Sequence, residues 1–238
     1  MDIVGRTDRG RLRERNEDSV GVDEALGVAV VADGMGGLQD GHVASREAVA
    51  AVLAHLGATP RPLGAAALEA ALAAADARVR ACARAAASVM GTTAVVLAMQ
   101  DGCCRIAHVG DSRAYWYHRG VLAQVTRDHS MVQELVDRGL LSPQAARHSP
   151  SRNVITRAIG LDAPCQPDCV ELAPAADDLL LLCSDGLWDM LEDGRIADLL
   201  TGCGAGREAL CRCMDALVDA ANEAGGADNV TVVLARSG

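Results

Sequence analysis

Apolar and polar positions alternate in blocks along the chain, and the lengths of the blocks predict short strands and long helices. Runs of Val, Leu, Ile and Ala bounded by glycine, aspartate or asparagine are typical of buried strands. Residues 2–22 predict two strands joined by a polar turn. Further strands are predicted at residues 27–33, 92–99, 103–109, 113–118, 121–126, 170–172, 178–184 and 229–235.

Helices are predicted where apolar residues recur with the helical period or where helix-favouring residues accumulate. Residues 41–56 place one apolar stripe along a helix, and residues 63–88 are rich in alanine with little glycine or proline. Shorter helices are predicted at residues 129–138, 192–200 and 207–223.

The turns between strands suggest how the strands pair. Asp101-Gly102 and Arg119-Gly120 separate consecutive strands, and such dipeptides are hairpin signals. We therefore expect residues 92–126 to form an antiparallel meander, and strands 170–172 and 178–184 to pair with each other. Long helices inserted between runs of strands indicate the α+β class, with helices packed over antiparallel sheets.

Length and composition fit one folded unit. The chain has 238 residues with no internal repeat and no second-domain boundary, so we expect a single domain spanning residues 1–238. Half of the residues are apolar, but aromatic residues make up only 2% and phenylalanine is absent. The core must therefore consist of Val, Leu, Ile, Ala and Met.

Charge, targeting signals and cysteine usage exclude several classes of function. The formal net charge of −10 argues against sequence-independent nucleic-acid binding, which needs a basic surface. Neither a signal region nor a membrane-length apolar stretch is present, so we expect a soluble, cytoplasmic protein. The nine cysteines are odd in number and lack zinc-site spacing, which predicts reduced thiols. Gly202, Gly204 and Gly206 do not follow a strand, which argues against dinucleotide binding.

Acidic residues recur where predicted strands begin or end. Asp33-Gly34, Asp111-Ser112 and Asp185-Gly186 each follow an apolar run, whereas Glu17-Asp18 and Asp228-Asn229 each precede one. A single Asp-Gly pair is ordinary turn chemistry. Five acidic sites at strand ends, however, are positioned to converge at one edge of a sheet. Hard divalent cations such as Mg²⁺ and Mn²⁺ prefer such oxygen ligands, so the pattern predicts a metal site.

Two other stretches allow a functional and a structural interpretation. The turn at residues 8–18 carries four arginines beside acidic residues, either as a solvated face or to hold a phosphate through a guanidinium. Residues 127–160 are more polar and irregular, and they predict either a lid beside the site or a surface loop.

The motifs, taken together and in order, resemble one family. They are Arg13-Glu-Arg-Asn-Glu17-Asp18, Ala32-Asp33-Gly34-Met35-Gly36-Gly37, Val109-Gly110-Asp111-Ser112-Arg113, Ser184-Asp185-Gly186-Leu187-Trp188 and Asp228-Asn229-Val230-Thr231. This set resembles the metal-dependent serine/threonine protein phosphatases of type 2C in their compact bacterial form. The resemblance covers essentially the whole chain. It implies two stacked antiparallel sheets flanked by helices, with a metal cluster at one end, and residues 127–160 as a flap subdomain.

The resemblance also implies roles for the acidic residues around the first metal ion. Asp33 would bridge two ions, and the carbonyl oxygen of Gly34 would bind one of them. Asp185 and Asp228 would complete the protein ligands of the first ion. Asp33 and Asp185 are thus implied to be essential for catalysis.

Further roles follow from the same resemblance. Glu17 and Asp18 would serve the second ion or the waters around it. Asp111, together with Asp185, would hold the more labile third ion of bacterial members. Arg13 would clamp the substrate phosphate.

The sequence departs from the family pattern where a general acid could lie. Bacterial relatives often have His after the double glycine and Glu after the next glycine, whereas this chain has Leu38 and His42. Met35 replaces the histidine of animal relatives, as is common in bacterial ones. The proton donor to the leaving group is therefore left open between His42, His129 and water.

The function implied is hydrolysis of phosphoserine and phosphothreonine on proteins by a water activated at two Mn²⁺ or Mg²⁺ ions. Phosphorylated proteins would be the partners, and a serine/threonine kinase would catalyse the opposing reaction. We expect a monomer that binds neither membranes nor nucleic acid. One alternative is a catalytically silent phosphoprotein-binding module of the same fold, and another is a two-metal nuclease, which the acidic charge disfavours.

Overall fold

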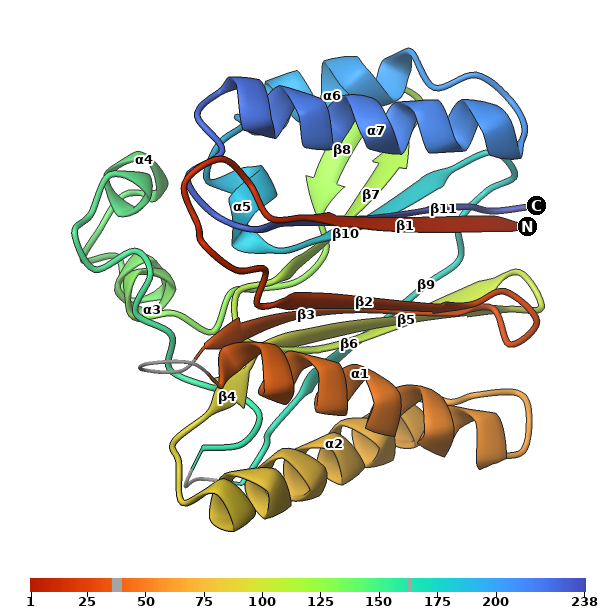
Figure 1. Cartoon of the computed structure of the whole chain (residues 1–238). Helices are drawn as coiled ribbons and strands as arrows, with labels where there is room; N and C mark the ends of the chain where they lie inside the picture. Colours follow the sequence, from red (N-terminus) through yellow and green to blue (C-terminus); the bar gives the residue numbers. More distant parts are fainter. Residues whose placement is uncertain (36–39, 162–163) are drawn as a thin grey trace.

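Two antiparallel sheets face each other, and helices cover both outer faces (Figure 1). The structure is a computed structural model that describes residues 1–35, 40–161 and 164–238. The strands are β1 (Asp2–Asp8), β2 (Asp18–Asp23), β3 (Val28–Met35), β4 (Gly91–Thr92), β5 (Ala94–Gln100), β6 (Cys103–Val109), β7 (Arg113–His118), β8 (Val121–Gln124), β9 (Asp168–Leu172), β10 (Leu179–Cys183) and β11 (Val230–Arg236). The helices are α1 (Gly41–Ala58), α2 (Ala65–Ala86), α3 (Met131–Asp137), α4 (Pro143–Arg147), α5 (Asp185–Trp188), α6 (Asp193–Thr201) and α7 (Arg207–Glu223).

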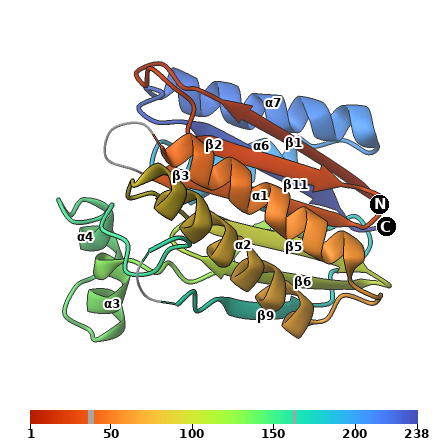
Figure 2. The ribbon, with the colours of Figure 1, turned by 60° about the horizontal axis from the view of Figure 1, so that its bottom comes forward.

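The strand order confirms the predicted fold class. One sheet has the order β1-β11-β10-β7-β8, and the other has the order β2-β3-β5-β6-β9 with β4 paired to the end of β3. All pairs are antiparallel, and the first and last strands of the chain, β1 and β11, are neighbours. Helices α1 and α2 lie side by side over the second sheet (Figure 2), and α6 and α7 cover the first.

Two predicted strand pairings are wrong. Residues 92–126 do not form one meander, because β5 and β6 belong to one sheet and β7 and β8 to the other. The chain crosses between the sheets just after β6, where Gly110 has a φ of 102°. The predicted pair of strands at 170–172 and 178–184 is also divided, since β9 pairs with β6 and β10 lies between β7 and β11. The two hairpins predicted within residues 92–126 are confirmed, since β5 pairs with β6 and β7 pairs with β8. Only the expected pairing of β6 with β7 is absent, and β9 and β10 each pair with strands distant in sequence.

Three layers of apolar side chains hold the fold together. A central layer between the sheets contains Ile3, Val31, Leu97 and Leu180, while two outer layers join each sheet to its helices. Because β5, β10 and β11 are covered on both faces, their sequences are continuous apolar runs rather than alternating ones. Alanine-rich α2 packs closely on α1. Among the described residues, no helix is long and apolar enough to span a membrane.

The polar segment after β8 contains two capped short helices. Ser130 caps α3 by accepting a hydrogen bond from the N–H of Gln133, and Ser142 caps α4 in the same way from Ala145. The sequence predicted α3 but not α4, which lies in the stretch interpreted as irregular. Helix α5 was also missed, because its four residues are too few to show a helical period.

Candidate metal centre

The predicted acidic residues converge on one cavity at the end of the sandwich that carries α3 and α4, at the left of Figure 1. The cavity has a volume of about 270 Å³. It is lined by Arg13, Glu17, Asp33, Gly34, Met35, Thr93, Asp111, Asn153, Ile155, Asp185, Asp228 and Asn229. Every predicted site residue except Asp18 is in this set.

Asp33 and Gly34 lie at the end of β3, where the strand meets the start of α1. A Cβ on Gly34 would lie 2.1 Å from the carbonyl oxygen of Gly41 and 2.6 Å from that of Glu17, so only glycine fits there. Thr93 fixes the backbone of Asp33, because its hydroxyl accepts a hydrogen bond from the Asp33 N–H (3.1 Å) and its own N–H donates to the Asp33 carbonyl (2.9 Å).

Asp111 and Asp185 come from the two different sheets and are joined by the short helix α5. Asp185 is the first residue of α5, and the indole Nε1 of Trp188 at the other end of this helix donates to the Asp111 carbonyl oxygen (3.1 Å). Arg113 lies 3.7 Å over the Trp188 ring and forms a bidentate pair with Asp128. Helix α5 therefore fixes the backbone of one acidic residue relative to the other.

Asn229 organises the arginine-rich turn. Its side-chain Nδ2 donates to the carbonyl oxygens of Arg9 and Arg15, both at 2.9 Å, and its Oδ1 accepts from the N–H of Glu17 at 2.8 Å. Its own N–H donates to Asp228 (2.8 Å). One amide side chain thus ties the turn, Glu17 and Asp228 into a single arrangement. The only sequence signal for this role is that Asn229 directly follows Asp228, and no sequence signal points to Thr93.

Arg13 is the only cationic side chain among the described residues that line the cavity. Its guanidinium lies 2.6 Å from the carboxylate of Asp228, and 54% of its side chain is exposed. This hydrogen bond raises the pKa of Arg13, with the charges of Asp228, Asp185 and Asp33 adding to the effect. Arg13 therefore lines the cavity while it is half exposed to solvent, and its role as a phosphate clamp stays a prediction.

Asp18 lies behind the wall of the cavity instead of lining it. Its carboxylate accepts hydrogen bonds from the hydroxyls of Ser184 (2.7 Å) and Thr231 (2.6 Å), which join β2 to the ends of β10 and β11. Burial raises the pKa of Asp18 to about 6, against these two hydrogen bonds, which lower it. Neighbouring residues of an extended chain point to opposite sides, which separates Asp18 from Glu17.

The buried carboxylates strongly disfavour one another's negative charge. Burial, and then repulsion from Asp18, Asp185 and Asp111, raises the pKa of Asp33 well above its usual value. Burial, and then repulsion from Asp111 and Asp228, does the same for the pKa of Asp185. Burial raises the pKa of Asp111 to about 7. Arg13 alone does not compensate this charge, so the cavity favours added positive charge.

The donor set fits hard divalent cations. All the candidate ligands are oxygens, and Oδ1 of Asp185 is buried with no hydrogen-bond partner among the described residues. In the described part of the chain, no three His, Cys, Asp or Glu side chains are already drawn together closely enough to hold an ion. The oxygen donors, their charge and the unpartnered Asp185 oxygen therefore fit a divalent cation. The carboxylate side chains would have to move closer together when an ion binds.

Neither candidate histidine lines the cavity. His129 is buried, and its Nδ1 accepts a hydrogen bond from the N–H of Gly110 (3.2 Å) while its Nε2 lies 3.2 Å from Asp168. Burial, and then the charge of the stacked His108, lowers the pKa of His129. His42 is in the first turn of α1, and its Nδ1 is buried. Leu38, the other departure from the family pattern, lies outside the described residues.

The segment predicted as a flap contributes to the cavity wall. Asn153 and Ile155 line the cavity, and the neighbouring Arg152 forms two hydrogen bonds with Asp189, at 3.1 and 3.2 Å. Arg147 in α4 donates to the carbonyl oxygens of Trp188 and Leu191. These contacts hold the segment against α5, the helix that begins with Asp185.

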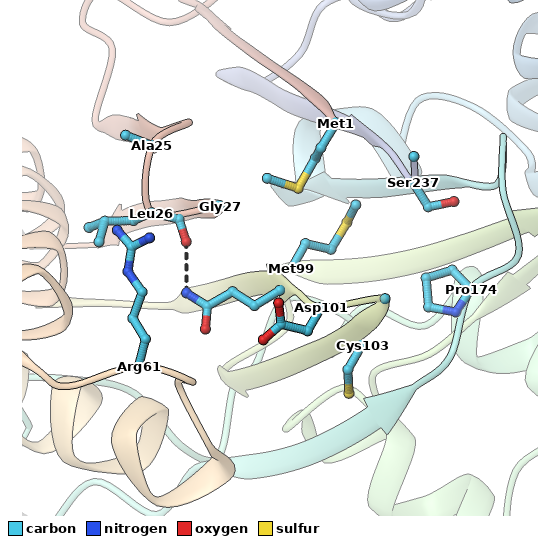
Figure 3. A pocket seen from close by; sticks show the side chains of 13 residues that line it. Met1, Ala25, Leu26, Gly27, Arg61, Met99, Asp101, Cys103, Pro174 and Ser237 are labelled. Carbon is cyan, nitrogen blue, oxygen red and sulfur yellow. Dashed lines mark hydrogen bonds between the residues drawn. The ribbon is translucent and has the colours of Figure 1, made fainter.

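A second cavity of about 360 Å³ opens at the other end of the sandwich, beside both chain termini (Figure 3). Its walls include Met1, Met99, Arg61 and Pro174, and Asp101 is the only acidic side chain among its described lining residues. It lacks the concentration of oxygen ligands found at the first cavity. The cavity that carries Asp33 and Asp185 is therefore the one whose donor atoms fit a metal ion.

Known proteins are similar to this chain in both sequence and fold. A family model described as Protein phosphatase 2C matches residues 9–225. The serine/threonine phosphatase stp of Listeria innocua is 37% identical over 238 residues, which cover 96% of this chain and 93% of that protein. The serine/threonine protein phosphatase PstP of Mycobacterium tuberculosis is 38% identical over 236 residues, which cover 98% of this chain and 44% of that protein.

Solved structures of bacterial serine/threonine phosphatases share the fold of this chain. Stp1 of Staphylococcus aureus superposes with a TM-score of 0.91 at 32% identity, covering 100% of this chain and 95% of that one. The catalytic domain of PstP in complex with two manganese ions superposes with a TM-score of 0.87 at 34% identity, covering 99% and 97%. The chain therefore belongs to the protein phosphatase 2C family and is a metal-dependent serine/threonine protein phosphatase.

Proposed function

We propose that the chain hydrolyses phosphoserine and phosphothreonine on proteins at two divalent cations, Mn²⁺ or Mg²⁺, held at the cavity of Asp33 and Asp185. The observation that supports this best is the convergence of five acidic side chains and Arg13, among the described residues, on one cavity. The manganese ions of the related PstP catalytic domain add support for the choice of metal. A serine/threonine kinase would catalyse the opposing reaction.

The oxygen atoms that line the cavity are the candidate ligands. Asp33, the Gly34 carbonyl, Asp185, Asp228 and Glu17 would hold the two ions. When bound, the cations would supply a nucleophilic water at neutral pH and offset the charge of the phosphoryl oxygens.

The remaining carboxylates extend this arrangement. Asp18, behind the wall, contributes negative charge, since its repulsion raises the pKa of Asp33. Asp111 lines the cavity on the side of α5 and, with Asp185, would hold a third ion.

Arg13 and the flap segment act on the substrate itself. The exposed guanidinium of Arg13 donates charge-assisted hydrogen bonds that hold the phosphate and orient phosphorus for in-line attack. Asn153 and Ile155 form the wall from which residues 127–160 contact the substrate beside the phosphate. Because no histidine is among the described residues that line the cavity, we propose that solvent water protonates the departing serine or threonine oxygen, which leaves as a hydroxyl group.

The proposal is tested by replacing one ligand at a time without changing side-chain size. Asp33→Asn and Asp185→Asn should abolish phosphate release from a phosphothreonine peptide while leaving the circular dichroism spectrum unchanged. Asp198→Asn, an acidic residue on α6 outside the cavity, is the matched control and should retain full activity. Wild-type activity in either ligand variant would contradict the assignment.

The silent-module alternative makes a different prediction in the same assay. A binding module would retain the phosphopeptide without releasing phosphate, even with Mn²⁺ bound. An acidic residue is present at every position where a side chain is the candidate ligand, which argues against this alternative, because a module without turnover does not need these carboxylates.

A further inference from the structure

A pair of cysteines lies on the far side of the molecule from the carboxylates. Cys203 is in the glycine-rich loop between α6 and α7, and Cys213 is in the second turn of α7. Both approach Arg236, the last residue of β11, whose first residue follows Asp228-Asn229. At about 3.3 Å per strand residue, roughly 20 Å separates the two ends of this strand. The cysteine pair is therefore independent of the metal centre (Figure 1).

The surroundings of Cys203 stabilise a thiolate. Nη2 of Arg236 lies 3.3 Å from the Cys203 Sγ and also donates to the carbonyl oxygen of Gly204 at 2.7 Å. The Arg236 side chain is only 12% exposed, so its charge acts on the sulfur with little screening by solvent. Hydrogen bonding from the Cys213 thiol, together with the charge of Arg236, lowers the pKa of Cys203 to about 7.

The second cysteine has the opposite character. Cys213 is buried, and its Sγ lies 3.6 Å from the carbonyl oxygen of Leu199. The Sγ of Cys203 lies 3.9 Å from the carbonyl oxygen of Ala209, one turn before Cys213 on α7, which places the two thiols at the same point of the helix. The neighbouring Cys203 sulfur, followed by burial, raises the pKa of Cys213. A partly exposed thiolate beside a buried thiol is the arrangement of an oxidation-sensitive cysteine with its resolving partner.

We propose that Cys203 and Cys213 form a reversible redox site that responds to hydrogen peroxide. The Cys203 thiolate attacks one peroxide oxygen and becomes a sulfenic acid, and the other oxygen leaves as hydroxide. The Cys213 sulfur then attacks the Cys203 sulfur, and the sulfenic oxygen leaves as water once the thiol proton is transferred. Two thiols are oxidised to one disulfide, peroxide is reduced to water, and a dithiol reductant reverses the change. Gly202 and Gly204, which flank Cys203, allow the loop to adjust to the new bond.

The chain suits a mass-spectrometric test, because arginines separate the three nearby cysteines. Trypsin places Cys203 in peptide 196–207, Cys211 in peptide 208–212 and Cys213 in peptide 213–236. After treatment of the intact protein with peroxide and blocking of free thiols, we expect the first and third peptides to be recovered as one disulfide-linked species. Cys211, which is also partly exposed, is the internal control and should remain alkylated.

Thiol reactivity tests the same site before oxidation. The rate of alkylation of Cys203 by iodoacetamide should have its midpoint near pH 7. At that pH the reaction should be about threefold faster than for a thiol with an ordinary pKa, because the larger thiolate fraction outweighs the lower nucleophilicity of the Cys203 thiolate. Arg236→Gln and Cys213→Ser should move the midpoint to higher pH, whereas Cys211→Ser should not. Equal alkylation of Cys203 and Cys211, or a peroxide product that links Cys203 to Cys211, would overturn the proposal.

Discussion

Replacing Gly34 with alanine is the sharpest test of how the fold positions the metal centre. The added Cβ would lie 2.1 Å from the Gly41 carbonyl oxygen, whereas ordinary contacts begin near 3.4 Å, so one group must move by the difference of 1.3 Å. The obstructing atoms are backbone atoms of α1 and of the turn that carries Glu17, which have no rotamer to change. Overpacking of this kind costs about 1–3 kcal/mol.

The assay for this variant separates stability from metal binding. Urea unfolding in excess chelator should show a loss of about 1–3 kcal/mol for Gly34→Ala. Activation by Mn²⁺ should require a higher concentration, because the Gly34 carbonyl and Asp33 move together. Gly194→Ala is the matched control, since no atom lies within 4 Å of its Cβ position in α6. Unchanged unfolding and unchanged Mn²⁺ activation in Gly34→Ala would refute this account of the β3–α1 contact.

Three further predictions follow from other contacts. Arg13→Ala should lower kcat/KM for a phosphopeptide about 10–100-fold, which is the equivalent of losing a charge-assisted hydrogen bond. Arg9→Ala on the same turn should change kcat/KM little, and a loss of less than about tenfold for Arg13→Ala would exclude the phosphate clamp. His129→Leu should lower the free energy of unfolding in urea by about 1–3 kcal/mol, because the Gly110 N–H loses its acceptor. His129→Asn should recover part of this free energy, since its side-chain oxygen lies near the position of Nδ1. Equal losses in the two variants would show that only the volume of the side chain matters. Because the folded-state pKa of Asp18 is raised to about 6, its stabilising contribution to metal-free protein should be complete below about pH 4 and be lost, by about 3 kcal/mol, as pH rises through 6. Asp18→Asn should remove this pH-dependent loss in denaturation curves recorded with chelator.

The strand-end carboxylates were predictable because their signal is local. Apolar runs that end at Asp33, Asp111 and Asp185 must turn at the surface, and only a sheet edge can bring them together. The signals for helix α2, its length and its alanine content, also lie within one stretch of sequence. These features needed no knowledge of which strands are neighbours.

The features that sequence reasoning missed depend on contacts between distant segments. Strands β6 and β7 lie in different sheets, as do β9 and β10, because each pairs with strands from other parts of the chain. The local turn residues do not encode these pairings. The position of Asp18 depends on which side of β2 faces the cavity, since adjacent residues point in opposite directions. The environment of Cys203 is created by Arg236, 33 residues away in sequence. The single-domain extent, cytoplasmic location and monomeric state stay predictions.

The central claim is that the carboxylate cavity is a two-metal phosphatase centre, and a combined metal titration tests it most directly. Mn²⁺ binding to metal-free protein would be followed by calorimetry, and phosphate release from a phosphothreonine peptide would be measured at each point. The account predicts that activity rises with the binding of two ions per chain and is lost in excess chelator. Release that persists in chelator, or no release with two ions bound, would contradict it.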